Sequence, residues 1–377
     1  MAPQVAVYTT PPEKLVELLA RSHPLLTLPL IRRLQFAARF PGGITEHARI
    51  LWSSRLSLED YHHRHILDLG GSTNHAEAEA GAGAGDGDAE VKTAAGKEET
   101  EKRNGRTASE EQAPFAAAYL DLSRGPETEL WIYSSMEARM YGLEGKEGPK
   151  DPEREREETA CAVALLREVK RQQDLYFAPA SARAAEREFP TILVGNLNEV
   201  LRERLVAPEV GMALVSTGLY DKWIFEVGEL PDVGLPEVLG DDGGRRWAWD
   251  VVRKEDIAFT ISRTKIPRRE RTMKLLASTA LYLDDGTPIA WAFLGPDSSL
   301  SSLHCEEPYR GRGIAKAVAV KVLRDHLRNY GGSDYYGWAD VAPDNIQSRG
   351  VCRSLNGQVR WQISWSRLNL DQSFPDE

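Results

Sequence analysis

Apolar and polar positions alternate with two different periods along the last third of the chain, and these periods predict a succession of strands and helices. Apolar runs over 277–283 and 289–294 flank the turn sequence Asp284-Asp285-Gly286-Thr287. This arrangement predicts a β-hairpin. Short apolar runs predict two further strands, over 300–305 and 335–341.

Between these strands the period changes to that of a helix. Ile314, Val318, Val322 and Leu327 recur at helical spacing, which predicts a helix over 314–328 with one buried face. Two more elements complete this region: a helix over 345–355 with Asp344 or Asn345 as its N-cap, and a half-buried strand over 359–365, where Val359, Trp361, Ile363 and Trp365 alternate with polar residues.

The first 230 residues show weaker patterns. The stretch 142–158 is highly charged and is predicted to lie on the surface. The strands over 115–122 and 129–134 are close enough in sequence to form a hairpin. The predicted helices are 11–21, 160–176 and 198–206, and the predicted strands are 66–69, 115–122, 129–134, 191–194, 212–215 and 223–227.

Composition divides the chain. A length of 377 residues favours two domains, because single domains average roughly 150 residues. Residues 72–112 contain mainly Ala, Gly, Glu, Asp and Lys, so they bury too little apolar surface to offset chain entropy and are predicted to be a disordered insertion. The Pro-, Gly- and Asp-rich stretch 232–245 is the predicted linker. We therefore expect an N-terminal domain over 1–231 and a C-terminal domain over 246–377, with an α+β, layered architecture.

Other global features exclude several classes of protein. Cys161, Cys305 and Cys352 have neither metal-ligand spacing nor the pattern of a disulfide framework, which favours a reducing compartment. The histidines at 62, 63 and 65 do not share one helix face, and we predict no metal site there. No apolar run approaches the ~20 residues of a membrane span. The formal charge of −10 and the lack of a known module argue against nucleic-acid binding. A cytoplasmic or nuclear location is expected.

The most informative stretch is Tyr309-Arg310-Gly311-Arg312-Gly313-Ile314-Ala315, between a predicted strand and a predicted helix. Glycine-rich backbone at a helix start directs several N–H groups toward one point, where the helix dipole also favours an anion. The stretch lacks the Lys-Ser or Lys-Thr of a Walker loop and the three glycines of a dinucleotide-binding loop. Six basic residues between 309 and 332, against the single acid Asp325, suit a polyphosphate: Arg310, Arg312, Lys316, Lys321, Arg324 and Arg328.

The residues Arg310, Gly313 and Ala315 form an Arg-x-x-Gly-x-Ala pattern that resembles the pyrophosphate loop of the GNAT (GCN5-related N-acetyltransferase) superfamily. The order hairpin, strand, glycine loop, helix, strand, helix, strand is that of a GNAT core. The string from Leu281 to Val318, followed by Trp338 to Ser348, is similar to the C-terminal half of the glycine N-acyltransferase-like families. The resemblance covers Met273 to Trp365, about a quarter of the chain.

This resemblance implies a GNAT fold with a mixed central sheet in the C-terminal domain and a diverged GNAT-like N-terminal domain. It also implies acetyl-CoA or another acyl-CoA as the donor substrate. The thioester would lie between the strands at 300–305 and 335–341. The residues implied in binding it are Leu303 and Cys305 through their backbone, Arg310, Gly311, Arg312, Gly313, Ile314, Ala315 and Lys316 in the loop, and Asn345 and Ser348 on the following helix.

The catalytic residues depart from the family pattern. Many GNAT enzymes place a tyrosine seven residues after the Asn as the acid that protonates the thiolate; here that position holds Cys352. The position of the glutamate base in the glycine acyltransferase relatives holds Ser299. His304 and Glu306, with Glu307 beside them, are substitute candidates for the base, since an attacking amine must lose a proton.

Two hypotheses follow. The first is an acyl-CoA-dependent N-acyltransferase that acts on the primary amine of a small molecule or an amino acid, without a metal, with its oligomeric state open. The second, motivated by Cys352 and Ser299, is a catalytically reduced GNAT-fold module that binds CoA or a partner without turnover.

Overall fold

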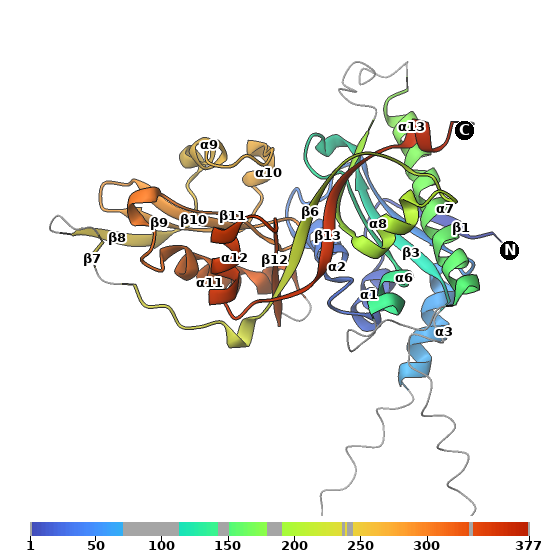
Figure 1. Ribbon diagram of the computed structural model, residues 1–377, viewed down its shortest axis with the longest axis horizontal. Helices are drawn as coiled ribbons and strands as arrows, with labels where there is room; N and C mark the ends of the chain where they lie inside the picture. Colours follow the sequence, from blue (N-terminus) through green and yellow to red (C-terminus); the bar gives the residue numbers. More distant parts are fainter. Residues whose placement is uncertain are drawn as a thin grey trace, which may run out of the picture.

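The computed structural model describes residues 2–70, 113–141, 151–178, 191–235, 238–239, 244–331 and 335–375. Within these ranges the chain forms two β-sheets covered by helices (Figure 1). This is the layered mixture of helices and strands that the sequence predicts. The insertion predicted over 72–112 lies outside the described residues, and so does the part of the charged stretch from 142 to 150.

The larger sheet has eight strands in the order β1-β2-β3-β4-β5-β13-β6-β12. It is mixed, because β4 and β5 are parallel while the other neighbours are antiparallel. Its strands are β1 (Gln4–Tyr8), β2 (Ala48–Ser54), β3 (Phe115–Asp121), β4 (Leu130–Ser134), β5 (Ile192–Asn198), β6 (Ala213–Glu226), β12 (Tyr336–Val341) and β13 (Gln358–Asn369).

The smaller sheet has five antiparallel strands in the order β11-β10-β9-β8-β7. The predicted hairpin is confirmed as β9 and β10, and the predicted strand before the glycine loop is confirmed as β11. The strands are β7 (Val238–Leu239), β8 (Arg245–Asp250), β9 (Ser278–Leu283), β10 (Pro288–Leu294) and β11 (Leu300–Cys305).

Helices cover both faces of each sheet. In the N-terminal half, α1 (Glu13–Ser22), α2 (Leu28–Arg39) and α3 (Leu58–Gly70) pack on one face of the larger sheet. The opposite face is covered by α7 (Pro152–Tyr176) and α8 (Glu199–Val206). Residues of β3 alternate between these two cores, as the two-residue period of a strand requires. The short helix α6 (Ser135–Tyr141) follows β4 directly, and α13 (Leu370–Ser373) follows β13.

In the C-terminal half, α11 (Ile314–His326) packs against β9, β10 and β12, and α12 (Ile346–Ser354) joins the same core. The other face of the smaller sheet is covered by α9 (Ile257–Ser262) and α10 (Glu270–Met273). The predicted helix over 345–355 is confirmed, and Asn345 is its N-cap.

The two halves exchange strands at their junction. The C-terminal strand β13 lies between β5 and β6, so it completes the sheet of the N-terminal half. The long strand β6 lies between β13 and β12, so it extends the sheet toward the C-terminal half. Figure 1 shows β6 and β13 side by side where the two halves meet. The division into 1–231, 232–245 and 246–377 stays a prediction.

Several predicted elements of the N-terminal half are wrong. Residues 66–69 belong to helix α3 rather than to a strand, because the Ser57 hydroxyl accepts a hydrogen bond from the Asp60 N–H and starts a helix that continues to Gly70. The charged residues 152–158 form the first turns of α7, where the Asp151 side chain caps the N–H groups of Glu153 and Arg154.

Two boundaries also differ. The strands predicted over 212–215 and 223–227 are one strand, β6, whose charged residues tolerate burial because Lys222 pairs with Asp340 on β12. The helix predicted over 314–328 ends as an α-helix at His326 and continues as a 3₁₀ turn over Leu327–Tyr330.

Candidate active site

The two sheets meet at an opening between β11 and β12. Each of these two strands is an edge strand of its sheet. In the described part of the chain, one parallel bridge between Ser299 and Trp338 joins them outside the regular ladders. Past this bridge, the facing edges of β11 and β12 carry N–H and C=O groups that are not used in a ladder between the two strands. Such an edge can pair with the amides of an extended ligand.

Strand β11 has a bulge next to the bridge. Trp291 of β10 pairs with His304, and Phe293 pairs with Ser301, so two residues of β11 face the single Ala292. Ser302 in this bulge has a φ of 50°. A bulge of this kind leaves one backbone group out of the ladder and changes the direction of the strand.

The bulge sorts the side chains of β11 onto two faces. Leu300, Leu303 and Cys305 pack into the core beneath α11. His304 stacks on Trp291, and Ser301 accepts a hydrogen bond from Arg268, so these two face the side covered by α9 and α10. Leu303 and Cys305 can therefore contribute their backbone, but not their side chains, to the opening between the strands.

The glycine loop between β11 and α11 has two left-handed residues. Gly311 has a φ of 77° and Gly313 a φ of 78°, and Gly313 is the N-cap of α11. A Cβ atom at either glycine would meet nothing within 4 Å, so conformation rather than crowding requires glycine here. The first hydrogen bond of the helix runs from Ala317 N–H to Gly313 C=O. The N–H groups of Ile314, Ala315 and Lys316 are therefore outside the helical ladder, as an anion site requires.

The basic residues near this loop have different roles. The Nε of Arg310 donates to the carbonyl of Cys305 at 2.9 Å, which ties the loop back to β11. Lys321 pairs with Asp325 at 2.7 Å, and Arg324 pairs with Asp232 at 2.8 Å. Lys321 and Arg324, in the distal part of the basic stretch, are thus compensated by acids of the chain itself.

His304 and Glu306 lie beside each other. The His304 Nε2 is 3.4 Å from Glu306 Oε1, and that oxygen also accepts from Arg263 Nε at 2.8 Å. The imidazole stacks on the indole of Trp291 with 4.6 Å between ring centroids. Burial is the main cause that lowers the pKa of His304 below its usual value, so the ring is neutral at pH 7. A neutral histidine can accept a proton, but Glu306 is held by an arginine.

The residues predicted on α12 have mainly local contacts. The Asn345 side chain accepts from the Ser348 N–H at 3.0 Å and caps the helix. Cys352 is buried, and burial raises the pKa of its thiol to about 12. A thiol with that pKa stays protonated and is a poor proton donor to a thiolate.

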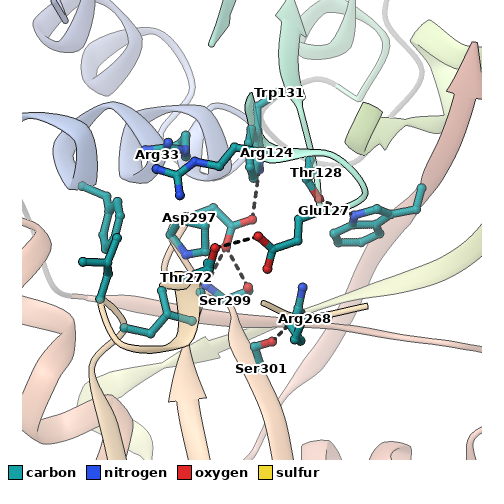
Figure 2. Close-up of a pocket in the computed structure, with 16 residues that line it drawn as sticks. Arg33, Arg124, Glu127, Thr128, Trp131, Arg268, Thr272, Asp297, Ser299 and Ser301 are labelled. Carbon is teal, nitrogen blue, oxygen red and sulfur yellow. Dashed lines mark hydrogen bonds between the residues drawn. The ribbon is translucent and has the colours of Figure 1, made fainter. Parts of the chain in front are cut away.

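A pocket lies between the two halves, next to the bridge that joins β11 and β12 (Figure 2). It encloses about 60 Å³. The N-terminal half contributes residues of α2 and of the β3–β4 connection, and the C-terminal half contributes α10 and the start of β11. The polar and charged lining residues are Arg33, Arg124, Glu127, Thr128, Arg268, Thr272, Asp297, Ser299 and Ser301; the aromatic ones are Phe36, Trp131 and Trp365.

Asp297 is the central acid of this pocket. It is 3% exposed, and its Oδ2 accepts from the indole N–H of Trp131 at 3.1 Å. Its Oδ1 accepts from the Ser299 hydroxyl at 2.7 Å and from the Ser299 N–H at 3.1 Å. Ser299 is thus linked directly to a buried carboxylate.

A second carboxylate, Glu127, faces Asp297 from the N-terminal half. Its Oε2 accepts from the Thr272 hydroxyl at 2.6 Å, and its Oε1 accepts from the Arg269 N–H at 3.1 Å. Both donors are at α10, so Glu127 fixes the first turn of that helix against the N-terminal half. These bonds hold the two walls of the pocket together.

A buried ion pair stands near the pocket on β6 and β12. Lys222 Nζ lies 2.6 Å from Asp340 Oδ1 and 3.4 Å from the centroid of the Trp338 ring. Burial raises the pKa of Asp340 to about 6 and lowers the pKa of Lys222 to about 8. The negative charge of Asp297 raises the pKa values of both Asp340 and Lys222. The charge state of this pair is therefore coupled to the charge of Asp297 in the pocket.

Comparison with known protein families identifies the chain. Residues 2–223 match the family described as acyl-CoA N-acyltransferase verG N-terminal domain, and residues 248–357 match the acetyltransferase (GNAT) family. The chain belongs to the verG-type acyl-CoA N-acyltransferase family. Its predicted GNAT membership and its GNAT fold with a second GNAT-like domain are confirmed. A comparison with curated proteins finds no match.

Three of the solved structures that match this chain have low sequence identity to it. A tandem GNAT protein from the clavulanic acid biosynthesis pathway is 10% identical, with 97% of each chain covered and a TM-score of 0.44. A Drosophila protein is 14% identical over 68% of this chain and 74% of its own, with a TM-score of 0.45. A GCN5-related N-acetyltransferase from Kribbella flavida is 15% identical over 67% of this chain and 86% of its own, with a TM-score of 0.40.

The N-terminal half of this verG-type protein also has an opening between two strands of its sheet. β4 and β5 are parallel and pair only at Leu130–Val194 and Trp131–Gly195 among the described residues. Helix α6 begins at Ser135, immediately after β4 ends. The Glu137 carboxylate accepts from the Ser134 N–H at 2.9 Å, so a side chain of the protein itself occupies this junction. Among the residues described between β4 and β5, no loop corresponds to the glycine loop of the C-terminal half.

Sequence reasoning placed the glycine loop and the strand beside it, but it missed most of the pocket. Asp297 is two residues from Ser299, and its place in a Gly-Pro-Asp turn was the available signal. Glu127, Trp131 and Arg268 gave no signal, because their function depends on contacts across the two halves. Among the described residues, no group of three or more potential metal ligands is present, and no helix is long and apolar enough to cross a membrane.

Proposed function

We propose that this GNAT-family protein is an acyl-CoA-dependent N-acyltransferase that transfers an acyl group from a CoA thioester to the primary amine of a small molecule or amino acid. The observation that carries the proposal is the juxtaposition in the C-terminal half of three features. These are the open edge of β11 with its bulge, the glycine loop at the start of α11, and a charged pocket beside the bridge at Ser299.

The donor would occupy the opening between β11 and β12. The pyrophosphate suits the N–H groups from Gly311 to Lys316, since these start a helix and lie outside its ladder. The pantetheine amides suit the free edge of β11 at Leu303 and Cys305. Asn345 and Ser348 lie at the start of α12, directly after β12, and so border the same opening.

The reaction needs one proton acceptor and one proton donor. The amine nitrogen attacks the thioester carbon, the carbon–sulfur bond breaks, and the thiolate leaves. The proton that the ammonium loses goes to a base, and the thiolate gains a proton. A backbone N–H freed by the bulge of β11 is suited to stabilise the oxyanion that forms on the carbonyl oxygen.

Asp297 with Ser299 is our first candidate for the base. The pair borders the pocket and the bridge between β11 and β12, where the amine and the thioester would meet. The Ser299 hydroxyl can pass a proton to the carboxylate, to which it donates at 2.7 Å. His304 is the alternative that the sequence predicts; it lies on the same side of the sheet but stacks on Trp291 and neighbours Glu306. Neither Cys352 nor Glu306 is well placed as a proton carrier.

Two measurements test the proposal. Isothermal calorimetry with coenzyme A measures whether the donor site exists. Release of free thiol from acetyl-CoA and longer acyl-CoAs, in the presence of a panel of amines, measures turnover. We expect binding and acceptor-dependent thiol release. Binding without release for any donor and acceptor would favour the catalytically reduced module, and the absence of CoA binding would exclude both.

A further inference from the structure

The pocket between the two halves is lined by a partly buried arginine, Arg268, that forms no ion pair. Arg268 donates from Nη2 to the Ser301 hydroxyl at 2.9 Å. Its Nε is buried and has no hydrogen-bond partner. None of the ion pairs found within the described ranges includes Arg268, although the charges of Glu127 and Asp297 act on its guanidinium. A partly buried guanidinium that forms no ion pair and has a buried, unpaired Nε can accommodate an anion.

The other two arginines of the pocket are already engaged. Arg124 donates from Nε to Asp121 at 3.0 Å. The guanidinium of Arg33 donates to the carbonyl of Gly43 and lies 3.7 Å from the centroid of the Tyr119 ring. In the view of Figure 2, Arg268 lies on the opposite side of the pocket from these two, with Asp297 and Glu127 between. The Nε of Arg33 also has no hydrogen-bond partner, but Arg33 is almost fully buried against the Tyr119 ring, so Arg268 is the better candidate to contact a ligand.

The position of Arg268 relative to Ser299 indicates how an acceptor would be oriented in the pocket. Arg268 is held by Ser301 of β11, and the proposed base relay begins at Ser299, the extended residue directly before this strand. Two residues of a strand span roughly 7 Å. A short molecule with an amine at one end and an anionic group at the other can bridge this distance with one hydrogen bond at each end. Its amine would then face the bridge between β11 and β12, where the thioester would lie.

We propose that Arg268 binds a carboxylate of the acceptor, so that the acceptor is an amino acid or another small amine that carries a carboxylate. This rests on the proposed N-acyltransferase function. A monoanion suits the site because Glu127 and Asp297 would repel a dianion such as a phosphate ester. The guanidinium fork matches a carboxylate in two parallel hydrogen bonds. A cavity of about 60 Å³ has room for a small acceptor, on the order of four to six waters in volume.

The acceptor is not the only possible source of a carboxylate, because a dicarboxylic acyl group would carry one as well. The test therefore uses acceptor pairs that differ by the carboxylate alone: glycine with methylamine, and phenylalanine with 2-phenylethylamine. Each pair is measured with acetyl-CoA and with succinyl-CoA. The variants are Arg268→Gln, Arg268→Lys, and the control Arg269→Gln, which removes a neighbouring exposed guanidinium and keeps the backbone N–H that Glu127 accepts from.

We expect the wild type to use at least one amino acid with a kcat/KM at least tenfold above that of its decarboxylated partner. Arg268→Gln should lower kcat/KM for the amino acid ten- to a hundredfold, mainly through KM, and leave the simple amine within threefold. Arg268→Lys should restore part of the loss, and Arg269→Gln should behave as wild type. Equal losses for both members of a pair, or a loss confined to succinyl-CoA, would overturn the proposal while the N-acyltransferase function stands.

A binding measurement separates this inference from the activity. Calorimetry in the presence of coenzyme A compares N-acetylglycine with N-methylacetamide, which lacks the carboxylate. Selective binding of N-acetylglycine that is lost in Arg268→Gln supports the carboxylate site even if no acceptor is turned over. Equal or absent binding of both compounds by folded wild-type protein overturns it. Thermal melting of each variant checks that the loss is not caused by unfolding.

Discussion

Gly313 gives the sharpest test of the donor site, because a substitution there separates backbone strain from anion binding. Gly313 is the N-cap of α11 with a φ of 78°, and a Cβ atom there would meet nothing within 4 Å. Gly313→Ala therefore introduces left-handed strain of about 1–2 kcal/mol without a clash. Gly313→Glu introduces the same strain together with a carboxylate at the point where the phosphates are expected.

The electrostatic effect can be estimated. A carboxylate at ~5 Å from the two charges of a pyrophosphate costs about 1.7 kcal/mol in bulk water and about 7 kcal/mol at an effective dielectric of 20. The smaller figure corresponds to more than tenfold weaker binding, and the site lies between these limits. For the free protein, a carboxylate at a helix N-terminus is favourable by about 0.3–1 kcal/mol, which offsets part of the strain. We thus expect Gly313→Glu to fold and to bind CoA at least a hundredfold more weakly.

Calorimetry with coenzyme A and thermal melting check this prediction with four variants. Gly313→Ala should bind within tenfold of the wild type, and Gly313→Gln should fall between Ala and Glu because it adds bulk without charge. Gly228→Glu is the control for an added surface carboxylate, since Gly228 is exposed with open space around it. If folded Gly313→Glu binds CoA with unchanged affinity, the glycine loop is only a turn, and the assignment of the donor site is wrong.

Three further predictions concern the loop, the base and the N-terminal half. Arg310→Ala should weaken CoA binding ten- to a hundredfold by freeing the loop from the Cys305 carbonyl, measured by calorimetry beside Arg269→Gln; an unchanged affinity would show that this tie is not needed. Asp297→Asn should lower kcat at least a hundredfold in the thiol-release assay and His304→Gln less than tenfold; the reverse order would make His304 the base. Burial raises the pKa of Glu137 to about 8 from an unfolded value near 4.5, so the folded state binds more protons and loses stability as pH rises through this window. Glu137→Gln should therefore have the same stability as wild type at pH 4.5 but be more stable at pH 8 by denaturant unfolding, and equal stabilities at pH 8 would contradict the burial of a charge there.

The sequence by itself determined the elements whose signals are local. The turn at Asp284 to Thr287 sets the β9–β10 hairpin, and the helical spacing from Ile314 onward sets α11. The glycines at 311 and 313 sit at positive φ, a conformation that side chains disfavour. Each of these signals lies within a few residues of the structure it produces, so the strand, loop and helix of the donor site could be predicted.

Local patterns failed where capping or distant pairing decided the outcome. The apolar run Ile66 to Leu69 lies in a helix that starts at the Ser57 cap, nine positions before Ile66. The polar centre of β6 suggested a break, but Lys222 is accommodated by Asp340 from another part of the chain. A pattern read over a short window cannot include such partners.

Only the tertiary structure decided the pocket between the two halves. Trp131 and Asp297 are 166 positions apart and share a hydrogen bond, and Glu127 caps α10 from a similar distance. Strand β13 returns from the C-terminus to lie between β5 and β6, which brings the two halves together around this space. Burial then gives Arg268 and Asp297 an environment that their neighbours in sequence do not reveal. The physical reason is that charge and desolvation act through space, whereas a sequence pattern records only what is adjacent along the chain.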